Sequence, residues 1–218
     1  DSSVDNSVEY IRSKYKTKVK IVELAENKGQ NFARNRGAEL AIGEWLVFLD
    51  SDDSLTEGSL EILARKLDDN LVDILFAPCI DSNGLITTNR PNFEGTISYK
   101  DYLCGYIQGE HLPIHRKSAF LKCYFDESTR RAPNIGHLRV AKKSESIFIT
   151  NFIARNYNTI IEDSLTSRLK NKDHKSMKIV QGIILKETWL DRLKYCPLGL
   201  IKNLAKYCYY FVHCVFVK

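Results

Sequence analysis

The sequence predicts an α/β fold: a doubly wound, mostly parallel sheet followed by a C-terminal helical extension. Two observations carry this prediction. Strand-like and helix-like patterns alternate over residues 1–77, as they do in doubly wound sheets. In addition, the apolar run 46–49 stops abruptly at Asp50, Asp52 and Asp53. A short continuous apolar run is typical of a strand that is buried on both faces of a parallel sheet.

The elements of the first part follow one another at short intervals. Val8 and Ile11, at helical spacing among polar residues, predict a short amphipathic helix near the start. Asn27-Lys28-Gly29 predicts a turn. Apolar periodicity then predicts helices over 30–41 and 57–67, and apolar or β-branched runs predict strands over 19–24, 46–49 and 71–77.

The patterns from residue 78 onward are weaker. A strand–turn–strand is expected around Asn83-Gly84, because Asn-Gly pairs favour tight hairpin turns. The remaining expectations are short helices near 99–106 and from Lys117, an irregular loop over 125–136, a helix over 144–156 and a short β-like run over 158–161.

The C-terminal part, 187–218, has apolar residues at helical spacing, with a break at Pro197. Its uncharged stretch, 207–217, is too short to span a bilayer. Lys202 and Lys206 would each cost about 2.5–3.5 kcal/mol at a membrane centre. Two interpretations remain open: an amphipathic helix lying on an anionic membrane surface, or a helix packed on the protein's own core.

Composition limits the class of protein. The 218 residues carry a formal net charge of +5, which permits contact with anionic ligands without indicating nucleic acid as a partner. The six cysteines are irregularly spaced in apolar patterns, so we expect reduced, mostly buried thiols and a cytoplasmic setting. No signal peptide is visible, and the chain opens without methionine, so a preceding strand is expected to be missing.

The three aspartates after the apolar run indicate a candidate cation-binding site. In open α/β sheets, ligands bind beyond the carboxyl ends of the strands. Carboxylates so close together repel one another unless a cation lies between them. Hard oxygen ligands of this kind suit Mg²⁺ or Mn²⁺ shared with a phosphate. The alternative is a turn and helix cap, since Ser54 and Glu57 have the spacing of a capping box.

Three segments together resemble the family 2-type glycosyltransferases, which have a GT-A (Rossmann-like) fold. The start, Asp1-Ser2-Ser3-Val4-Asp5-Asn6-Ser7, is similar to the later part of that family's D-D-G-S-x-D-x-T segment. Asn27-Lys28-Gly29 with Ala33-Arg34-Asn35-Arg36-Gly37 is similar to N-x-G…A-R-N-x-G. Gly43-Glu44 with Phe48-Leu49-Asp50-Ser51-Asp52-Asp53 resembles G-E/K-aromatic…F-L-D-x-D-D, the metal-binding motif of the family.

The resemblance implies roles for particular residues. Asp52 and Asp53 would hold the metal, and Asp1, Arg34, Asp50 and Asp52 would lie at the nucleotide. Arg34 has an ordinary ion pair as its alternative role.

The family also carries Glu-Asp at the start of a helix, where the Asp is the general base. Ser144-Glu145-Ser146 is the best counterpart, with a serine at the Asp position. Glu145, Asp126 or Glu127 would therefore be the base, although helix capping is an equally simple role for Glu145.

Other polar residues stay unassigned. His111, His115 and His137 lack metal-ligand spacing, and an ordinary structural role is expected for them. The basic residues Arg130, Arg131 and Arg139 either close over a diphosphate or lie in a solvated loop.

These inferences lead to one expected function and two alternatives. The expected protein is a metal-dependent, inverting, hexosyltransferase-like enzyme that moves a sugar from a nucleotide-diphosphate donor to a cell-surface polysaccharide or glycolipid. Residues 1–77 would bind the donor, 78–170 the acceptor, and 171–218 would be the amphipathic tail, with membrane contact through 187–218 at the inner face. The alternatives are a truncated, non-catalytic nucleotide-binding or scaffolding remnant, and a nucleotidyltransferase, whose usual glycine-rich loop is not seen in the sequence.

Overall fold

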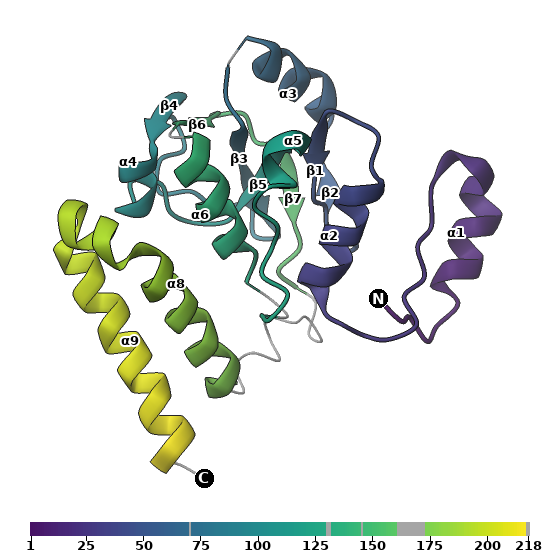
Figure 1. The fold of residues 1–218 in the computed structure, drawn as a ribbon. Coiled ribbons are helices and arrows are strands. Elements are labelled where there is room, and N and C mark those ends of the chain that lie inside the picture. The colour runs from purple at the N-terminus through teal and green to yellow at the C-terminus, as the bar shows by residue number, and fades with distance from the viewer. Residues whose placement is uncertain (70, 130–131, 145, 161–172, 217–218) are drawn as a thin grey trace.

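The computed structural model describes residues 1–69, 71–129, 132–144, 146–160 and 173–216. A central sheet lies between layers of helices (Figure 1), and helix α1, Ser7–Tyr15, stands away from it near the N-terminus. The last two helices form an arm on the other side of the molecule. The predicted α/β class with a C-terminal helical extension is confirmed.

The sheet is mixed. Its strand order is β1-β5-β3-β6-β4, with β2 and β7 pairing at the end of β3. β1, β3 and β6 point in one direction, because β3 is parallel to β6 and β5 is antiparallel to both β1 and β3. The sequence did not indicate that antiparallel β5 lies between β1 and β3. The strands are β1 Trp45–Val47, β2 Ser54–Leu55, β3 Ile74–Asp81, β4 Gly95–Ser98, β5 His111–Arg116, β6 Ser146–Ile149 and β7 Arg155–Tyr157.

β3 is buried on both faces, and this explains its uninterrupted apolar sequence. Leu75, Ala77 and Cys79 face a core that Leu63 and Leu67 of helix α3, Ser59–Asp68, complete. The other face of the strand carries Ile74 and Phe76, which pack with residues of helix α6, Pro133–Ser144. The two layers of helices therefore cover opposite faces of one sheet, as the doubly wound prediction requires.

Most of the expected helices are present. Helix α2, Gln30–Leu40, follows the predicted turn, and α3 has its apolar stripe against the sheet. The structure also contains the 3₁₀ turn Lys16–Lys18, α4 Tyr99–Leu103, α5 Lys117–Phe120, α8 His174–Tyr195 and α9 Pro197–Phe216. Pro197 separates α8 from α9, since proline is tolerated at the first helical position and not inside a helix.

Several expectations were wrong. Residues 19–24 form no strand, and among the described residues no strand pairs with them. The apolar run 46–49 is not buried on both faces, since Val47 and Leu49 are exposed. Residues 158–160 are not a strand either, and residue 161 lies outside the described residues. Among the cysteines, Cys79 and Cys123 are buried, whereas three of the others are exposed, and all six are free thiols.

The region from 125 to 156 contains the largest difference. The expected loop over 125–136 runs into helix α6. In place of the expected helix over 144–156, the chain forms two separate strands, β6 and β7. Phe148 and Phe152 at helical spacing produced the error, because a short apolar run does not distinguish a buried strand from a helix.

The C-terminal helices α8 and α9 pack against each other as a hairpin that projects from the sheet (Figure 1). Val180 of α8 packs on Ile135 of α6, whereas α9 has no buried residue among those described. Within the described part of the chain, the helices lack the combination of length and apolar character that crossing a membrane requires.

Gly109 provides a test of how tightly the loop before β5 is packed. Its φ is +107°, and a Cβ there would lie 1.7 Å from the Thr87 carbonyl oxygen. We expect Gly109→Ala to lower the free energy of unfolding in urea by at least about 2 kcal/mol. Gly37→Ala, inside helix α2 with no atom within 4 Å of the new Cβ, is the matched control and should raise it by up to about 1 kcal/mol. Equal effects of the two substitutions would contradict the packing described.

Candidate functional site

The three aspartates that end the apolar run come together in space. Each of Asp50, Asp52 and Asp53 offers a carboxylate oxygen, and these oxygens lie within 4.8 Å of one another. A turn between β1 and β2 produces the cluster, with the Asp53 N–H donating to the Asp50 carbonyl oxygen at 3.1 Å. The sequence prediction that these side chains gather beyond a strand end is therefore confirmed. Three hard oxygen donors at this spacing fit a divalent cation.

Asp53 is the buried member of the cluster. Its Oδ1 accepts a hydrogen bond from the Asn158 N–H at 2.9 Å, and its Oδ2 lies 3.2 Å from Nη1 of Arg155. Burial raises the pKa of the Asp53 carboxyl, the Asn158 amide and Arg155 lower it, and the charges of Asp52 and Asp50 raise it again. Oδ2 has no hydrogen-bond partner of good geometry. Further positive charge at this point would therefore stabilise the ionised group.

Two side chains of helix α2 bind the Asp50 carboxylate. Nη2 of Arg34 lies 2.5 Å from its Oδ1, and Gln30 Nε2 lies 3.4 Å from the same oxygen. The simpler alternative for Arg34, an ion pair, is thus what the structure contains. The pair also keeps the guanidinium beside the acidic cluster, where it can meet a second anion.

Asp1 belongs to the same side of the molecule. Its two carboxylate oxygens accept hydrogen bonds from the N–H groups of Lys28 and Gly29, each at 2.8 Å. Gly29 precedes helix α2 and has a φ of +93°, which favours glycine. Asp1 therefore holds the turn that starts the helix carrying Arg34.

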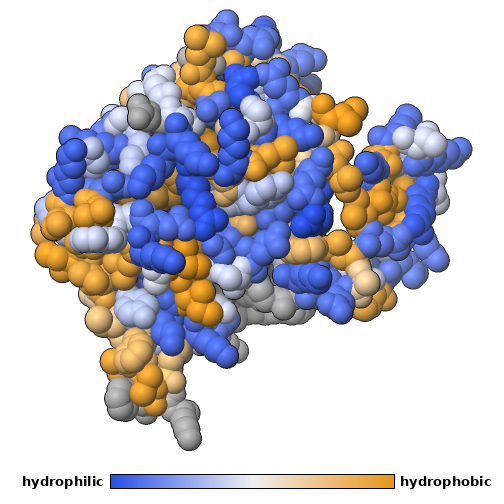
Figure 2. Space-filling view, viewed as in Figure 1, coloured by the Kyte–Doolittle hydropathy of each residue, from blue (hydrophilic) through white to orange (hydrophobic). Residues whose placement is uncertain are grey.

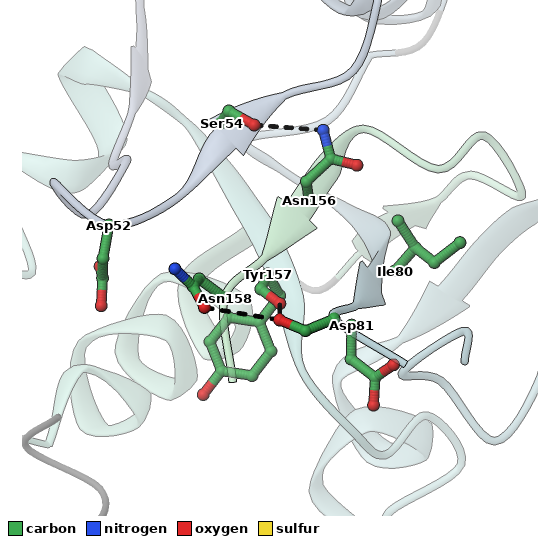
Figure 3. A pocket seen from close by; sticks show the side chains of 8 residues that line it. Asp52, Ser54, Ile80, Asp81, Asn156, Tyr157 and Asn158 are labelled. Atoms are coloured by element: carbon green, nitrogen blue, oxygen red, sulfur yellow. Dashed lines mark hydrogen bonds between the residues drawn. The ribbon is translucent and has the colours of Figure 1, made fainter. Parts of the chain in front are cut away.

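A cavity of about 370 Å³ opens beside Asp52 (Figure 3). In the view of Figure 3, Asp52 and Asp81 lie on opposite sides, Asn158 lies between them, and Asn156 is hydrogen-bonded to Ser54. Its lining is Asp52, Ser54, Ile80, Asp81, Ser82, Asn156, Tyr157 and Asn158. Asp52 is the exposed member of the acidic cluster, so a ligand in this cavity can reach its carboxylate directly.

The two described base candidates lie in the segment that connects α5 to α6. Asp126 is bound to Arg139 at 2.7 Å, and this ion pair helps to lower the pKa of the carboxyl against its burial. The Glu127 carboxylate accepts a hydrogen bond from Asn35 at 2.9 Å. Asn35 and Asn31 of helix α2 are fully buried and also bind main-chain oxygens of residues 125–129. Both carboxylates thus have structural partners.

The third candidate, Glu145, lies outside the described residues. The helix expected to begin at Ser144 is absent, because Ser144 is the last residue of α6 and Ser146 is the first of β6. The helix nearest to this segment, α6, begins instead at Pro133, and its first turn, which includes Asn134, has no acidic side chain.

Two of the histidines are packed inside the protein. His115 Nε2 and His137 Nδ1 lie 2.9 Å apart between aromatic rings. Burial lowers the pKa of His115 to about 3, and burial together with His115 lowers the pKa of His137. Both rings are therefore neutral, in keeping with the structural role expected.

The predicted basic loop is described only in part. Arg139 binds both Asp126 and Glu187, while Arg130 and Arg131 lie outside the described residues.

Sequence reasoning missed Arg155, a buried cation beside the acidic cluster. Its side chain is 4% exposed and contacts Asp53 at 3.2 Å, Glu110 at 2.7 Å and the Cys79 sulfur at 3.1 Å. An arginine directly after the apolar Phe152-Ile153-Ala154 was an available signal. The predicted helix over 144–156 concealed that the residue belongs to a strand beside β3.

The fold and the acidic cluster together define an α/β protein with a candidate cation site at a strand end, and comparison with known proteins identifies the family. The model of Glycosyl transferase family 2 matches residues 1–129, and the chain belongs to this family.

Relatives and solved structures agree with this assignment. The GalNAc(5)-diNAcBac-PP-undecaprenol beta-1,3-glucosyltransferase of Campylobacter jejuni is 28% identical over 143 residues, 64% of this chain and 46% of that protein. The uncharacterized glycosyltransferase MJ1057 of Methanocaldococcus jannaschii is 26% identical over 215 residues, 90% of this chain and 69% of its own length. The structure of S. aureus TarS 1-349 in complex with UDP-GlcNAc superposes with a TM-score of 0.73 at 18% identity, covering 100% of this chain and 65% of that one. The chain thus spans about half of the Campylobacter protein and about two thirds of the TarS chain.

Removing Arg155 tests its structural importance. We expect Arg155→Met to lower the free energy of unfolding by about 3–5 kcal/mol, because the Asp53 side chain is only 1% exposed and would be left without its partner. Adding Asp53→Asn should recover a large part of that loss. Urea unfolding of Arg155→Met, Asp53→Asn and the double variant measures the three free energies of unfolding. A double variant whose loss equals the sum of the two single losses would contradict the coupling.

Proposed function

We propose that the chain is the catalytic part of a metal-dependent, inverting glycosyltransferase that takes a sugar from a nucleotide-diphosphate donor. The observation that carries the proposal is the acidic cluster at the strand end beside an open polar cavity, in a chain of Glycosyl transferase family 2. The UDP-GlcNAc in the TarS structure supports a nucleotide sugar as donor.

Asp52 and Asp53 are the proposed metal ligands, and Mn²⁺ or Mg²⁺ is the proposed ion. Bound there, the ion would offset the negative charge that develops on the diphosphate as the sugar leaves. Asp50 and Arg34 are proposed to contact the nucleotide, since Arg34 keeps Asp50 oriented and adds positive charge. Asp1 supports them by holding the turn before α2.

The two parts of the sheet are proposed to divide the substrates. Residues 1–77 contain the acidic cluster and would bind the donor, while 78–170 would bind the acceptor, with 171–218 as the tail. A saccharide or glycolipid is the proposed acceptor, and the undecaprenol-linked substrate in the name of the Campylobacter relative supports it. Glu145, Asp126 and Glu127 are the sequence-based candidates for the general base.

A non-catalytic nucleotide-binding or scaffolding protein of the same family is the second candidate. The absence of an acidic side chain in the first turn of α6 favours it. Calorimetric titration with UDP and Mn²⁺, followed by an assay for UDP release from UDP-GlcNAc, separates the two functions. Binding without release would support the second.

Substitution of Asp52 tests the metal assignment. We expect Asp52→Ala to reduce Mn²⁺-dependent release of UDP from UDP-GlcNAc by at least about 100-fold, because the leaving diphosphate loses its bound countercharge. Asp68→Ala, an exposed aspartate at the end of α3, is the matched control and should behave like the unmodified chain. Full activity of Asp52→Ala would end the metal assignment.

Contact with a membrane surface is proposed for the arm formed by α8 and α9. Figure 2 shows hydrophobic residues along this arm at the lower left. The exposed apolar residues of α9 include Leu198, Ile201, Leu204, Phe211, Val212 and Val215. The helix contains Lys202 and Lys206 and no acidic residue, which suits anionic lipid. A cytoplasmic position at the inner face of the membrane is proposed together with this contact.

Vesicle binding tests this surface. We expect the protein to sediment with vesicles of phosphatidylglycerol and phosphatidylcholine, and Leu198→Glu with Ile201→Glu to weaken the partitioning roughly tenfold or more. Leu60→Glu is the matched control, because Leu60 in α3 is 60% exposed and Ile201 is 61% exposed. An equal loss in the control would contradict a specific role for α9.

A further inference from the structure

A second cavity opens at the start of β5. It has a volume of about 210 Å³, and its lining includes Tyr102, Glu110, His111 and Asn134. This is less than the roughly 300–1,000 Å³ of typical cofactor pockets, so it suits a small group such as one sugar ring. Phe76, also in the lining, stacks on Tyr102 with 5.3 Å between the ring centroids. Aromatic faces beside amide, imidazole and carboxylate groups are suited to a polyhydroxylated ligand.

Arg155 connects this cavity to the acidic cluster. Its Nη2 lies 2.7 Å from Oε1 of Glu110, and its Nη1 lies 3.2 Å from Oδ2 of Asp53. The Asp53 and Glu110 carboxylates are therefore held by neighbouring nitrogens of one planar guanidinium. Asp52, beside Asp53, is exposed to the first cavity. A group in the second cavity thus lies close to the proposed donor site.

Three side chains in the lining of the second cavity can accept a proton in principle. His137 is engaged with His115, and Nε2 of His111 is enclosed, out of contact with solvent. Burial also lowers the pKa of His111 to about 4. Glu110, in contrast, keeps 49% of its side chain exposed while Arg155 binds one of its oxygens. Asn134, at the start of α6, has no basic atom.

We propose that Glu110 accepts the proton of the hydroxyl group that attacks the donor sugar, with the acceptor's terminal saccharide in the second cavity. The inference rests on the glycosyl transfer proposed above. The acceptor O–H bond breaks and its proton passes to the Glu110 carboxylate. The oxygen forms the new bond to the anomeric carbon, and the bond from that carbon to the diphosphate breaks, leaving its electron pair on the diphosphate oxygen.

The surroundings explain why this carboxylate, and not the sequence-based candidates, takes the role. Asp126 binds Arg139 and Ser128, and Glu127 binds Asn35. Neither carboxylate lines the second cavity, whereas Glu110 does. Arg155 binds and orients the Glu110 carboxylate, which makes Arg155 a positioning residue.

The test uses the full chain with UDP-GlcNAc and Mn²⁺, and water as the acceptor. Glu110→Gln should lower the rate of UDP release by about 10²–10⁴-fold and leave the Kd for UDP, measured calorimetrically, unchanged. Added formate should restore part of the release in Glu110→Ala, because a small carboxylate can replace the missing base. Glu61→Gln, an exposed position of α3, is the matched control and should release UDP at the unmodified rate.

Three results would overturn the inference. One is full release by Glu110→Gln. Another is that the Glu110 variants lose both UDP binding and UDP release, and that formate restores neither. This result would mean that Glu110 only holds Arg155 in place. The third is a loss of release confined to Asp126→Asn or Glu127→Gln. If Asp52→Ala is inactive while Glu110→Gln is fully active, only this inference fails. If the unmodified chain neither binds nor releases UDP, both this inference and the proposed function fail.

Discussion

The structure of the site depends on the mutual repulsion of three carboxylates that one tight turn forces together. The turn places Asp50, Asp52 and Asp53 within 4.8 Å of each other, and two arginines from distant parts of the chain compensate the two less exposed ones. Arg34 comes from the helix before the turn, and Arg155 from a strand about a hundred residues later. Asp52 is exposed and lines the first cavity, where a ligand can reach its carboxylate.

Buried polar contacts add to strand pairing and apolar packing in joining residues 1–77 to the later part of the sheet domain. Asn31 and Asn35 of α2 are buried and hold residues 125–129 through side-chain amides. Arg155 likewise connects Asp53 to Glu110 across the end of β3. Hydrogen bonds and ion pairs between buried polar groups are directional, so these contacts help to set the geometry between the two parts.

The helical arm has a different character from the domain that carries it. α8 is anchored through Val180, while α9 packs mainly on α8 and leaves its apolar residues exposed. Exposed apolar surface of this extent marks an interaction site in soluble domains. This exposed apolar surface, together with the lysines of α9, supports the proposed arrangement. In that arrangement the arm contacts the lipid surface, and the cavities face a saccharide that is bound to the membrane.

The sequence by itself determined the acidic cluster and its partner on the preceding helix. The aspartates and Arg34 meet because they lie in one turn and the helix before it. Only the tertiary structure decided the second cavity and the contacts of Arg155. Residues 144–156 are too short and apolar for periodicity to separate strand from helix, and pairing with β3 makes them strands. Glu110 and Arg155 are 45 residues apart, and no local pattern relates them. Their contact exists because β5 and β7 pair with the same strand, β3.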